Sequence, residues 1–430
     1  MSISAILGLQ WGDEGKAKVV DVLTAEADVV VRFQGGANAG HTVAVGDRQF
    51  IFHLVPSGMI YPDTLCIIGN GAVVDPEQLF KEIEGLAAQG IHVGDRLKIS
   101  ERVHIVFPYH KVLDELREKS AGKGAIGTTK RGIGPAYGDK VSRVGIRSSD
   151  LFAPEFPQLL KRSLDEKNAV IEKVYGGTPL DFDTLVKQYR EYGERLRPML
   201  TDTGLLLEKL IKDGKKVLFE GAQGTMLDID HGTYPFVTSS NTIGPNMLTG
   251  SGYCLPGLSM LTLPADQVRI VGVVKAYTTR VGEGPFPTEL TGEAGEWLRQ
   301  QGAEFGATTG RPRRCGWLDI AQLRYATRLS GVTEVFLTKL DVLTGLDEIK
   351  VGVGYEGVEP GTFPANLGVV AKLNVQWQTF PGWKEDLTGC RKYSDMPENA
   401  RRYVDALQEL FGVPIRTVSV GPKRDQVLSR

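Results

Sequence analysis

Residues 12–16, "GDEGK", place a lysine behind a loop that contains two glycines and two acids. An apolar run ends at Gly8, and a helix-like pattern begins near Lys16, so a strand, a glycine-rich loop and a helix follow one another. That order is typical of a phosphate-binding loop. Lys16 can reach phosphate oxygens, and Gly12 and Gly15 let backbone N–H groups approach them.

The usual pattern, Gly-x-x-x-x-Gly-Lys-Ser/Thr, is broken twice in this loop. Gln10 replaces the first glycine, and Ala17 replaces the hydroxyl residue that binds magnesium. A carboxylate in the loop is then the natural metal ligand, and Asp13 is placed to be that ligand and to take a proton from a nucleophile. The alternative is that Asp13 and Glu14 only cap the following helix.

His41 ends a second glycine loop, "GGANAGH" at 35–41. Its position directly after Ala-Gly favours contact with a ligand, to which it could give a hydrogen bond or a proton. The alternative is a structural or surface histidine. The other five histidines form no i, i+4 pair, so histidine-bound zinc is not expected.

"TKLD" at 338–341 follows an apolar run and resembles the guanine-reading element of GTPases. The Asp341 carboxylate can accept from the N1–H and the 2-amino group of guanine, and the Lys339 stem can lie over the purine face. The alternative is a chance Lys-x-Asp at the end of a strand.

"GATTGRPRRC" at 306–315 gathers two threonines and three arginines in one glycine loop. Forked guanidinium groups suit a substrate that carries carboxylates or phosphates. A solvated basic turn is the alternative, above all for Arg314.

Short β-branched runs that alternate with helical stretches must position these loops. Several runs, such as "DVVVRF" and "VRIVGVV", lack polar alternation, as strands buried on both faces of a parallel sheet do. We therefore expect a single α/β domain over residues 1–430, with a mainly parallel central sheet and helices on both faces. Residues about 150–213 are expected to form a helical subdomain, and residues about 348–380 a small antiparallel excursion. Ligands of such a sheet bind beyond the carboxyl ends of its strands.

Composition excludes several classes of protein. The 50 basic and 52 acidic residues of the 430-residue chain give a formal charge of −2, so no global field attracts nucleic acid or an anionic membrane. The four cysteines form no C-x-x-C pair, which argues against zinc and against a disulfide framework. The sequence shows no signal peptide and no apolar stretch of transmembrane length. We expect a cytoplasmic protein without nucleic-acid or membrane partners.

Six segments taken together resemble the adenylosuccinate synthetase family. They are "QWGDEGK" at 10–16, "GGANAGHT" at 35–42, "GIGPAYGDKVSR" at 132–143, "EGAQGTMLDIDHGTYPFVTSSN" at 220–241, "GATTGRPRRCGWLD" at 306–319 and "LTKLD" at 337–341. The resemblance implies a P-loop-related fold, a homodimer, and a purine-biosynthesis enzyme that uses GTP and Mg2+ to ligate L-aspartate to IMP. Adenylosuccinate, GDP and phosphate are its products, formed through a 6-phosphoryl-IMP intermediate.

The resemblance also implies roles for individual residues. Catalysis is assigned to Asp13, Lys16, His41 and Gln223, and the metal ligands are Asp13 and the carbonyl of Gly40. GTP is assigned to Gly12, Asp13, Glu14, Gly15, Lys16, Ala17, Lys18, Gly40, His41, Thr42, Arg313, Lys339, Leu340, Asp341, Ser419, Val420 and Gly421. IMP is assigned to Asp13, Lys16, Asn38, Ala39, Gly40, His41, Thr129, Gln223, Thr238, Arg311 and Arg143, the last from the partner subunit. L-Aspartate is assigned to Ala307, Thr308, Thr309, Gly310, Arg311 and Arg313.

A departure from the family pattern at Ala17 and two rival functions bear on this interpretation. Ala17 stands where the family has glycine, which is harmless if the position is already helical and costly if it needs a positive φ. The main rival is a regulatory GTPase without ligase activity, which explains "GDEGK" and "TKLD" but not the arginine loop. A catalytically inactive binding scaffold is the third possibility.

Overall fold

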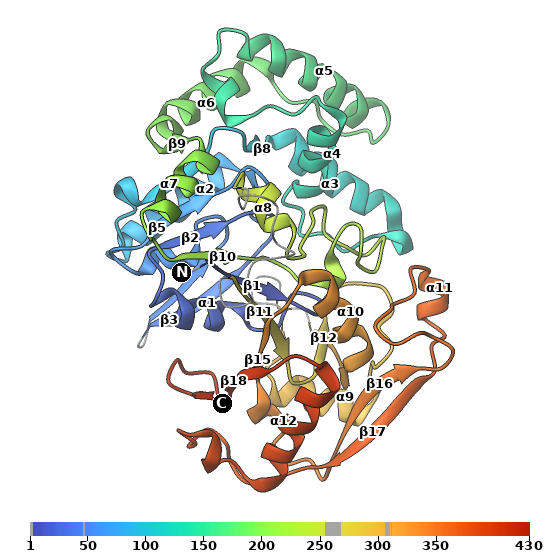
Figure 1. Ribbon diagram of the computed structural model, residues 1–430. Coiled ribbons are helices and arrows are strands. Elements are labelled where there is room, and N and C mark those ends of the chain that lie inside the picture. The colour runs from blue at the N-terminus through green and yellow to red at the C-terminus, as the bar shows by residue number, and fades with distance from the viewer. Residues whose placement is uncertain (1–2, 46–47, 254–267, 306–309, 311) are drawn as a thin grey trace.

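A ten-stranded sheet forms the centre of the protein in a computed structural model (Figure 1), which describes residues 3–45, 48–253, 268–305, 310 and 312–430. All neighbouring strands of this sheet are parallel except the last pair at one edge, β18 and β19. In spatial order the strands are β19 (Val427–Ser429), β18 (Ile415–Ser419), β15 (Glu334–Thr338), β11 (Val268–Lys275), β1 (Ile3–Gly8), β10 (Val217–Glu220), β2 (Val29–Arg32), β5 (Leu65–Ile68), β7 (Leu97–Ser100) and β9 (Leu200–Thr201). The expected mainly parallel α/β sheet is confirmed.

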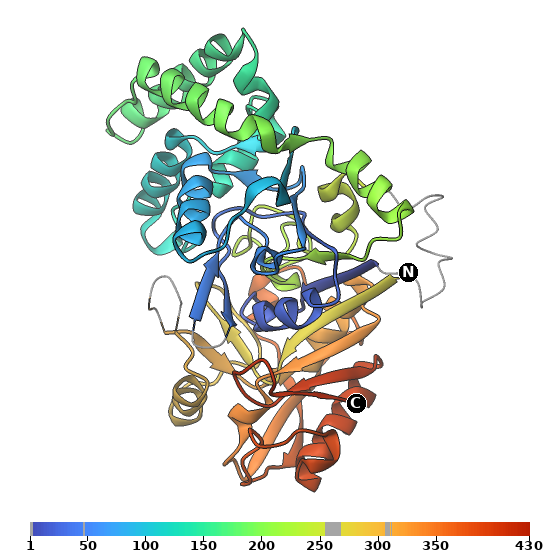
Figure 2. The ribbon, with the colours of Figure 1, turned by 90° about the vertical axis from the view of Figure 1, so that its left-hand side faces the viewer.

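The first strand of the chain lies in the interior of the sheet, between β11 and β10. Figure 2 shows β1 in dark blue beside the yellow β11. Pairing begins at Ile3, which lies opposite Val217 on one side and Val268 on the other. The loops that follow β1, β2, β10, β11, β15 and β18 therefore leave from one edge, where ligands of open α/β sheets bind.

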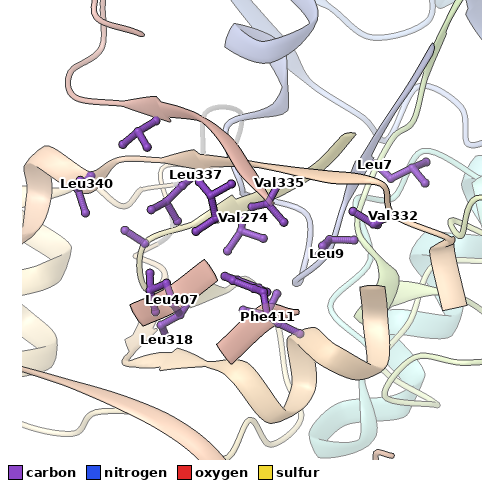
Figure 3. Close-up of a cluster of buried hydrophobic side chains, with 14 of the residues drawn as sticks. Leu7, Leu9, Val274, Leu318, Val332, Val335, Leu337, Leu340, Leu407 and Phe411 are labelled. Carbon is purple, nitrogen blue, oxygen red and sulfur yellow. The ribbon is translucent and has the colours of Figure 1, made fainter. Parts of the chain in front are cut away.

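Apolar residues of β1 alternate between two cores, one on each face of the sheet. Ala5 and Leu7 belong to a cluster that includes residues of α7, α10 and α12, whereas Ile6 belongs to a cluster with residues of α1, α2 and α3. Figure 3 shows part of the first cluster, in which Leu7 lies near Val332. Burial on both faces explains why the strand sequences lack polar alternation.

Helices cover both faces of the sheet and extend beyond it. They are α1 (Lys16–Thr24), α2 (Pro76–Ala88), α3 (Pro108–Ala121), α4 (Ile133–Ser142), α5 (Phe156–Lys173), α6 (Phe182–Leu196), α7 (Thr203–Lys212), α8 (Asn246–Ser251), α9 (Glu293–Gln301), α10 (Ile320–Ser330), α11 (Leu367–Val370) and α12 (Glu398–Phe411). In Figure 1 α5 and α6 lie at the top, and β16 and β17 lie at the opposite end of the molecule. No helix within the described ranges is long and apolar enough to cross a membrane.

Four small sheets complete the fold. They pair β3 (His41–Val45) with β4 (Arg48–Phe52), β6 (Val73–Val74) with β8 (His104–Ile105), β12 (Thr278–Arg280) with β13 (Arg314–Gly316), and β14 (Leu318–Asp319) with β16 (Glu348–Tyr355) and β17 (Val375–Pro381). The antiparallel pair of β16 and β17 is the β-rich excursion expected near 348–380. Helices α5, α6 and α7 occupy most of residues 150–213. The division of the chain into one domain with these insertions stays a prediction.

Candidate active site

The phosphate loop between β1 and α1 is held from inside by a buried carboxylate. Glu14 accepts hydrogen bonds from the backbone N–H groups of Gln10 (2.9 Å) and Gly12 (3.0 Å), and its other oxygen pairs with Lys16 Nζ at 2.6 Å. The helix-capping alternative is wrong, because Gly15, at φ 81°, is the N-cap of α1 and receives no side-chain cap. Ala17 lies within α1, so its methyl group causes no backbone strain there.

Asp13 is the carboxylate of this loop that faces outward. It lines a pocket of about 430 Å3 and forms an ion pair with Arg313, whose Nε lies 2.7 Å from Asp13 Oδ2. The two acids of "GDEGK" therefore do different things: Glu14 holds the loop, and Asp13 is available to a ligand.

The His41 ring is oriented by a second buried carboxylate. His41 is the first residue of β3, and its Nδ1 is hydrogen-bonded to Glu220 at the end of β10. Glu220 is fully buried and also accepts from the backbone N–H (2.9 Å) and hydroxyl (3.0 Å) of Ser57. Burial opposes its ionisation, but His41 and Arg32 outweigh burial and lower the pKa of Glu220. Because Nδ1 faces Glu220, Nε2 is the ring nitrogen left for a ligand.

The pocket brings together predicted residues from the loops that follow β1, β2, α3 and β10. Those that line it are Gly12, Asp13, Asn38, Ala39, Gly40, His41, Thr129, Gln223 and Thr238. Asn38 Nδ2 lies 3.5 Å from Thr238 Oγ1, so the loops after β2 and β10 meet there. Trp11, Arg280 and Glu283 also line the pocket, and the sequence analysis did not single them out.

Gln223 has the strongest structural sign of a ligand contact. Its backbone is left-handed, with φ 57°, and both its amide oxygen and its amide nitrogen are buried without a hydrogen-bond partner among the described residues. Buried polar atoms are rarely left unpaired unless a water or ligand completes them. The described non-glycine residues with positive φ are five, and Arg143, Gln223 and Lys339 among them are predicted site residues.

A second group of predicted residues gathers at the ends of β15 and β18. Lys18 Nζ donates to Ser419 Oγ (2.8 Å) and to the carbonyl of Gly421 (2.7 Å). Burial lowers the pKa of Lys18 to about 8. Asp341 Oδ1 is buried without a hydrogen-bond partner in the described structure, and burial raises the pKa of this carboxyl. Leu340 and Val420 belong to the same segments, but their side chains are buried in the hydrophobic core.

Other predicted residues either lie outside the described residues or do not line the pocket. Ala307, Thr308, Thr309 and Arg311 lie outside the described residues, and Gly310 is exposed. Arg143 is exposed at the C-cap of α4 and does not line the pocket. Lys16 and Thr42 adjoin pocket-lining residues without lining it themselves.

Two buried carboxylates near the site, Glu220 and Glu304, were not predicted from the sequence. Glu220 is the last residue of β10, and a charge at the end of a buried strand was the available signal for it. Glu304 lies three residues beyond the end of α9. Arg314, for which a solvated basic turn was the alternative, forms an ion pair with Glu289 and donates to the carbonyl of Gly284 at 2.6 Å.

Magnesium fits the donors at this site if a nucleotide supplies most of the oxygens. Within the part of the chain that the structure describes, no group of three or more His, Cys, Asp or Glu side chains could hold a metal ion alone. Magnesium is commonly bound through one or two carboxylates together with substrate phosphates and water. The outward-facing Asp13 carboxylate on the pocket wall meets that requirement.

A phosphate loop at the carboxyl edge of a parallel sheet, next to a pocket with a carboxylate, an imidazole and an amide, defines a nucleotide-dependent enzyme. The family model of adenylosuccinate synthetase matches residues 5–428. Adenylosuccinate synthetases of Carboxydothermus hydrogenoformans and Caldanaerobacter subterraneus subsp. tengcongensis are each 52% identical to the chain, over 100% of it and 99% of their own length. A structure of fully ligated adenylosuccinate synthetase from Plasmodium falciparum is 39% identical, with a TM-score of 0.92 and full coverage of both chains.

The chain therefore belongs to the adenylosuccinate synthetase family. It is a ligase that joins L-aspartate to IMP at the expense of GTP in AMP synthesis. The regulatory GTPase considered as a rival receives no support from these comparisons.

Proposed function

We propose that Asp13 is the general base of the first chemical step. It takes the proton from N1 of IMP, the 6-oxygen attacks the γ-phosphate of GTP, and GDP leaves with the electrons of the broken bond. The outward orientation of Asp13 on the pocket wall supports this role. In the structure the Asp13 carboxylate forms an ion pair with Arg313, and this ion pair has to open before Asp13 can accept a proton.

His41 and Lys16 stabilise the charge that develops on the transferred phosphoryl group. His41 donates through Nε2, since Nδ1 is bonded to Glu220. Lys16 is held by Glu14 at the start of α1, where backbone N–H groups also point toward a bound anion. Mg2+, held by the Asp13 carboxylate and the Gly40 carbonyl together with phosphate oxygens, would neutralise part of the phosphate charge.

The second step forms the carbon–nitrogen bond. The amine of L-aspartate attacks C6 of the 6-phosphoryl intermediate, and phosphate leaves as the C6–O bond breaks. Phosphorylation is needed because the 6-oxygen of IMP is otherwise a poor leaving group. Thr308, Thr309 and Arg311 are proposed to hold the aspartate carboxylates, together with Arg313 at the end of their loop.

Specificity for GTP is proposed to come from Lys339 and Asp341, and purine binding from Gln223. The buried, unpartnered oxygen of Asp341 and the two unpartnered amide atoms of Gln223 support these assignments. The pair of unpartnered atoms on Gln223, which lies in a pocket that also contains Asp13 and His41, is the observation that carries the proposal.

An isotope-exchange measurement tests the two-step mechanism. GTP carrying 18O in the β,γ bridge is incubated with IMP and Mg2+ but without aspartate. Reversible transfer to IMP lets the β-phosphate of bound GDP rotate, so the label appears in non-bridging positions. Scrambling should require IMP and should vanish in Asp13→Ala. Scrambling that is independent of IMP would contradict the proposal.

We also propose a homodimer in which Arg143 completes the IMP site of the partner subunit. Its exposure at the end of α4, away from its own pocket, supports this placement. Arg143→Leu and Asp13→Ala chains, each nearly inactive alone, should regain activity when mixed, because one site of the heterodimer then carries neither change. Subunit exchange without recovery would place Arg143 in its own site.

A further inference from the structure

A fully buried carboxylate, Glu304, binds side chains from three segments of the chain, two of which carry residues of the proposed site. Its Oε1 accepts from Lys275 Nζ at 2.9 Å and from Lys339 Nζ at 2.6 Å, and the Tyr277 hydroxyl donates to the same oxygen. Its Oε2 accepts from Arg313 at 2.7 Å. We call these five residues the Glu304 cluster.

The Glu304 cluster joins segments that lie far apart in the chain. Lys275 ends β11, Lys339 follows β15, and Arg313 closes the arginine loop. The backbone N–H of Arg313 also donates to the carbonyl of Glu304 at 2.9 Å. Glu304 therefore holds the C-terminal end of the arginine loop through the side chain and the backbone of Arg313, and the proposed guanine-reading segment through Lys339.

The charges of the cluster explain why the carboxylate is needed. Three cations surround Glu304, and Lys275 is as buried as Glu304 itself, so these charges could not be buried without a counter-ion. Burial opposes ionisation of Glu304, but Lys275 and Lys339 outweigh burial and hold its pKa below the usual range. Burial lowers the pKa of Lys275 to about 8.

Arg313 is shared between two carboxylates. One side of its guanidinium pairs with Glu304 and the other with Asp13. When Asp13 turns to its substrate, Glu304 still holds the arginine head at the site. The freed side of the guanidinium can then contact a phosphate or carboxylate without losing its buried anchor.

We infer that Glu304 is a positioning residue that holds Arg313 and Lys339 where GTP and L-aspartate need them. The inference rests on the proposed assignment of those two residues to substrates. Long cationic side chains lose rotamer entropy when a ligand orders them, and an anchor formed on folding removes that cost from the binding step. One carboxylate thus supports the sites of two substrates and leaves the IMP site to other residues.

Glu304→Gln is the direct test, because it keeps the shape and removes the charge. The KM values for GTP and for aspartate should each rise at least tenfold, while the KM for IMP should stay within threefold of the wild-type value. Glu304→Asp keeps the charge on a shorter stem and should recover part of the loss. If Glu304→Gln leaves the KM values for GTP and aspartate within threefold, or raises all three KM values equally, the inference is wrong.

Removal of the charge also leaves buried Lys275 without its counter-ion, which destabilises the fold. The double variant Lys275→Met/Glu304→Gln removes the buried cation together with the anion and should be more stable than Glu304→Gln alone. Lys275→Met by itself is the matched control, and its KM values should stay within threefold of wild type. A double variant with wild-type KM values would overturn the inference.

Three further variants separate this inference from a general loss of stability and from a failure of the proposed function. Glu82 is a buried glutamate that accepts backbone N–H groups of residues 53–55 and contacts no proposed ligand-binding residue through its carboxylate. Glu82→Gln should lower the unfolding temperature without moving any KM. If Arg313→Leu and Lys339→Leu leave KM unchanged, the proposed assignments fail and the inference with them. If those variants raise KM and Glu304→Gln does not, only the inference fails.

Discussion

The phosphate loop differs from Gln223 and Asp341, the two side chains proposed to face a base, in whether buried polar atoms have hydrogen-bond partners in the described structure. In the loop, Glu14 satisfies two backbone N–H groups and Lys16 from within the protein. In the base-facing region, the amide of Gln223 and one oxygen of Asp341 are buried without a partner in the described structure. The groups proposed to handle phosphate charge are thus paired when the protein folds, whereas the groups proposed to read a base are left for the ligand to complete.

Substitutions in the two regions should therefore affect different properties of the protein, folding stability in one and ligand binding in the other. A change inside the phosphate loop breaks an existing buried pair, so it costs folding stability. A change at Gln223 or Asp341 removes a group that has no hydrogen-bond partner in the described structure, so it should lower ligand affinity or specificity instead. Asp13 belongs to neither case, because it is partly exposed and its partner Arg313 has a second carboxylate.

Asp13→Ala should have the largest effect on activity. Loss of the general base should lower kcat by about 10^3- to 10^4-fold. The free energy of unfolding should change by less than about 1 kcal/mol, because the ion pair with Arg313 is partly exposed. Steady-state kinetics and urea unfolding measure the two quantities. Near-normal kcat would mean that Asp13 is neither base nor metal ligand.

Glu14→Gln should show the opposite pattern from Asp13→Ala. It leaves Lys16 buried next to an uncharged amide, and breaking a buried ion pair typically costs about 3–5 kcal/mol of stability. Urea unfolding should detect that loss. Unchanged stability would show that the loop does not depend on its internal carboxylate, and the contrast between the two regions would fail.

Asp341→Asn tests base recognition. The amide can accept from only one of the two guanine donors and presents a donor to the other, which should cost roughly 2–4 kcal/mol, or about 30- to 1,000-fold in kcat/KM for GTP. Xanthosine triphosphate has a carbonyl where guanine has its 2-amino group, so the variant should prefer it over GTP. ATP should stay a poor substrate, since adenine lacks the N1 donor. An unaltered preference for GTP would move base selection elsewhere.

Gln223→Met separates affinity from stability most directly. Methionine has a similar length and no hydrogen-bonding amide, so the KM for IMP should rise about 10- to 100-fold. Stability should be unchanged or slightly higher, because no existing hydrogen bond is lost. A clear loss of stability in urea unfolding would mean that the amide is already paired in the folded protein.

Ala17→Gly should have the smallest effect. The position lies in the first turn of α1, where glycine costs about 0.5–1 kcal/mol relative to alanine. Urea unfolding of the variant and of the wild type compares the two residues. A glycine variant that is more stable than wild type would show that the position carries strain.

The fold was predictable because its strands are unbroken apolar runs. Burial on both faces imposes that pattern on β1, β2 and β10, and each is followed by a loop in which the reactive residues are adjacent in sequence. Asp13, His41 and Gln223 could be named for that reason, and the pocket does bring them together. Their chemical roles stay predictions.

Contacts between loops could not be predicted in the same way. His41 and Glu220 are 179 residues apart, and Arg313 and Asp13 are 300 residues apart. Such pairs depend on the order of the strands in the sheet, which local patterns do not encode. Glu14 was misread as a possible helix cap because sequence cannot show that its side chain turns back toward the preceding loop.

The interior place of β1 in the sheet has a consequence for synthesis on the ribosome. Its two neighbours, β10 and β11, begin only at Val217 and Val268. At about 5–20 residues per second, roughly 10 to 50 s pass between translation of β1 and translation of its second neighbour. Until β10 has been translated, β1 has no native strand partner on either side, and until β11 follows it can pair on one side only. The nascent chain thus carries its phosphate loop from the start, and the sheet around that loop can close only after more than half of the protein has been made.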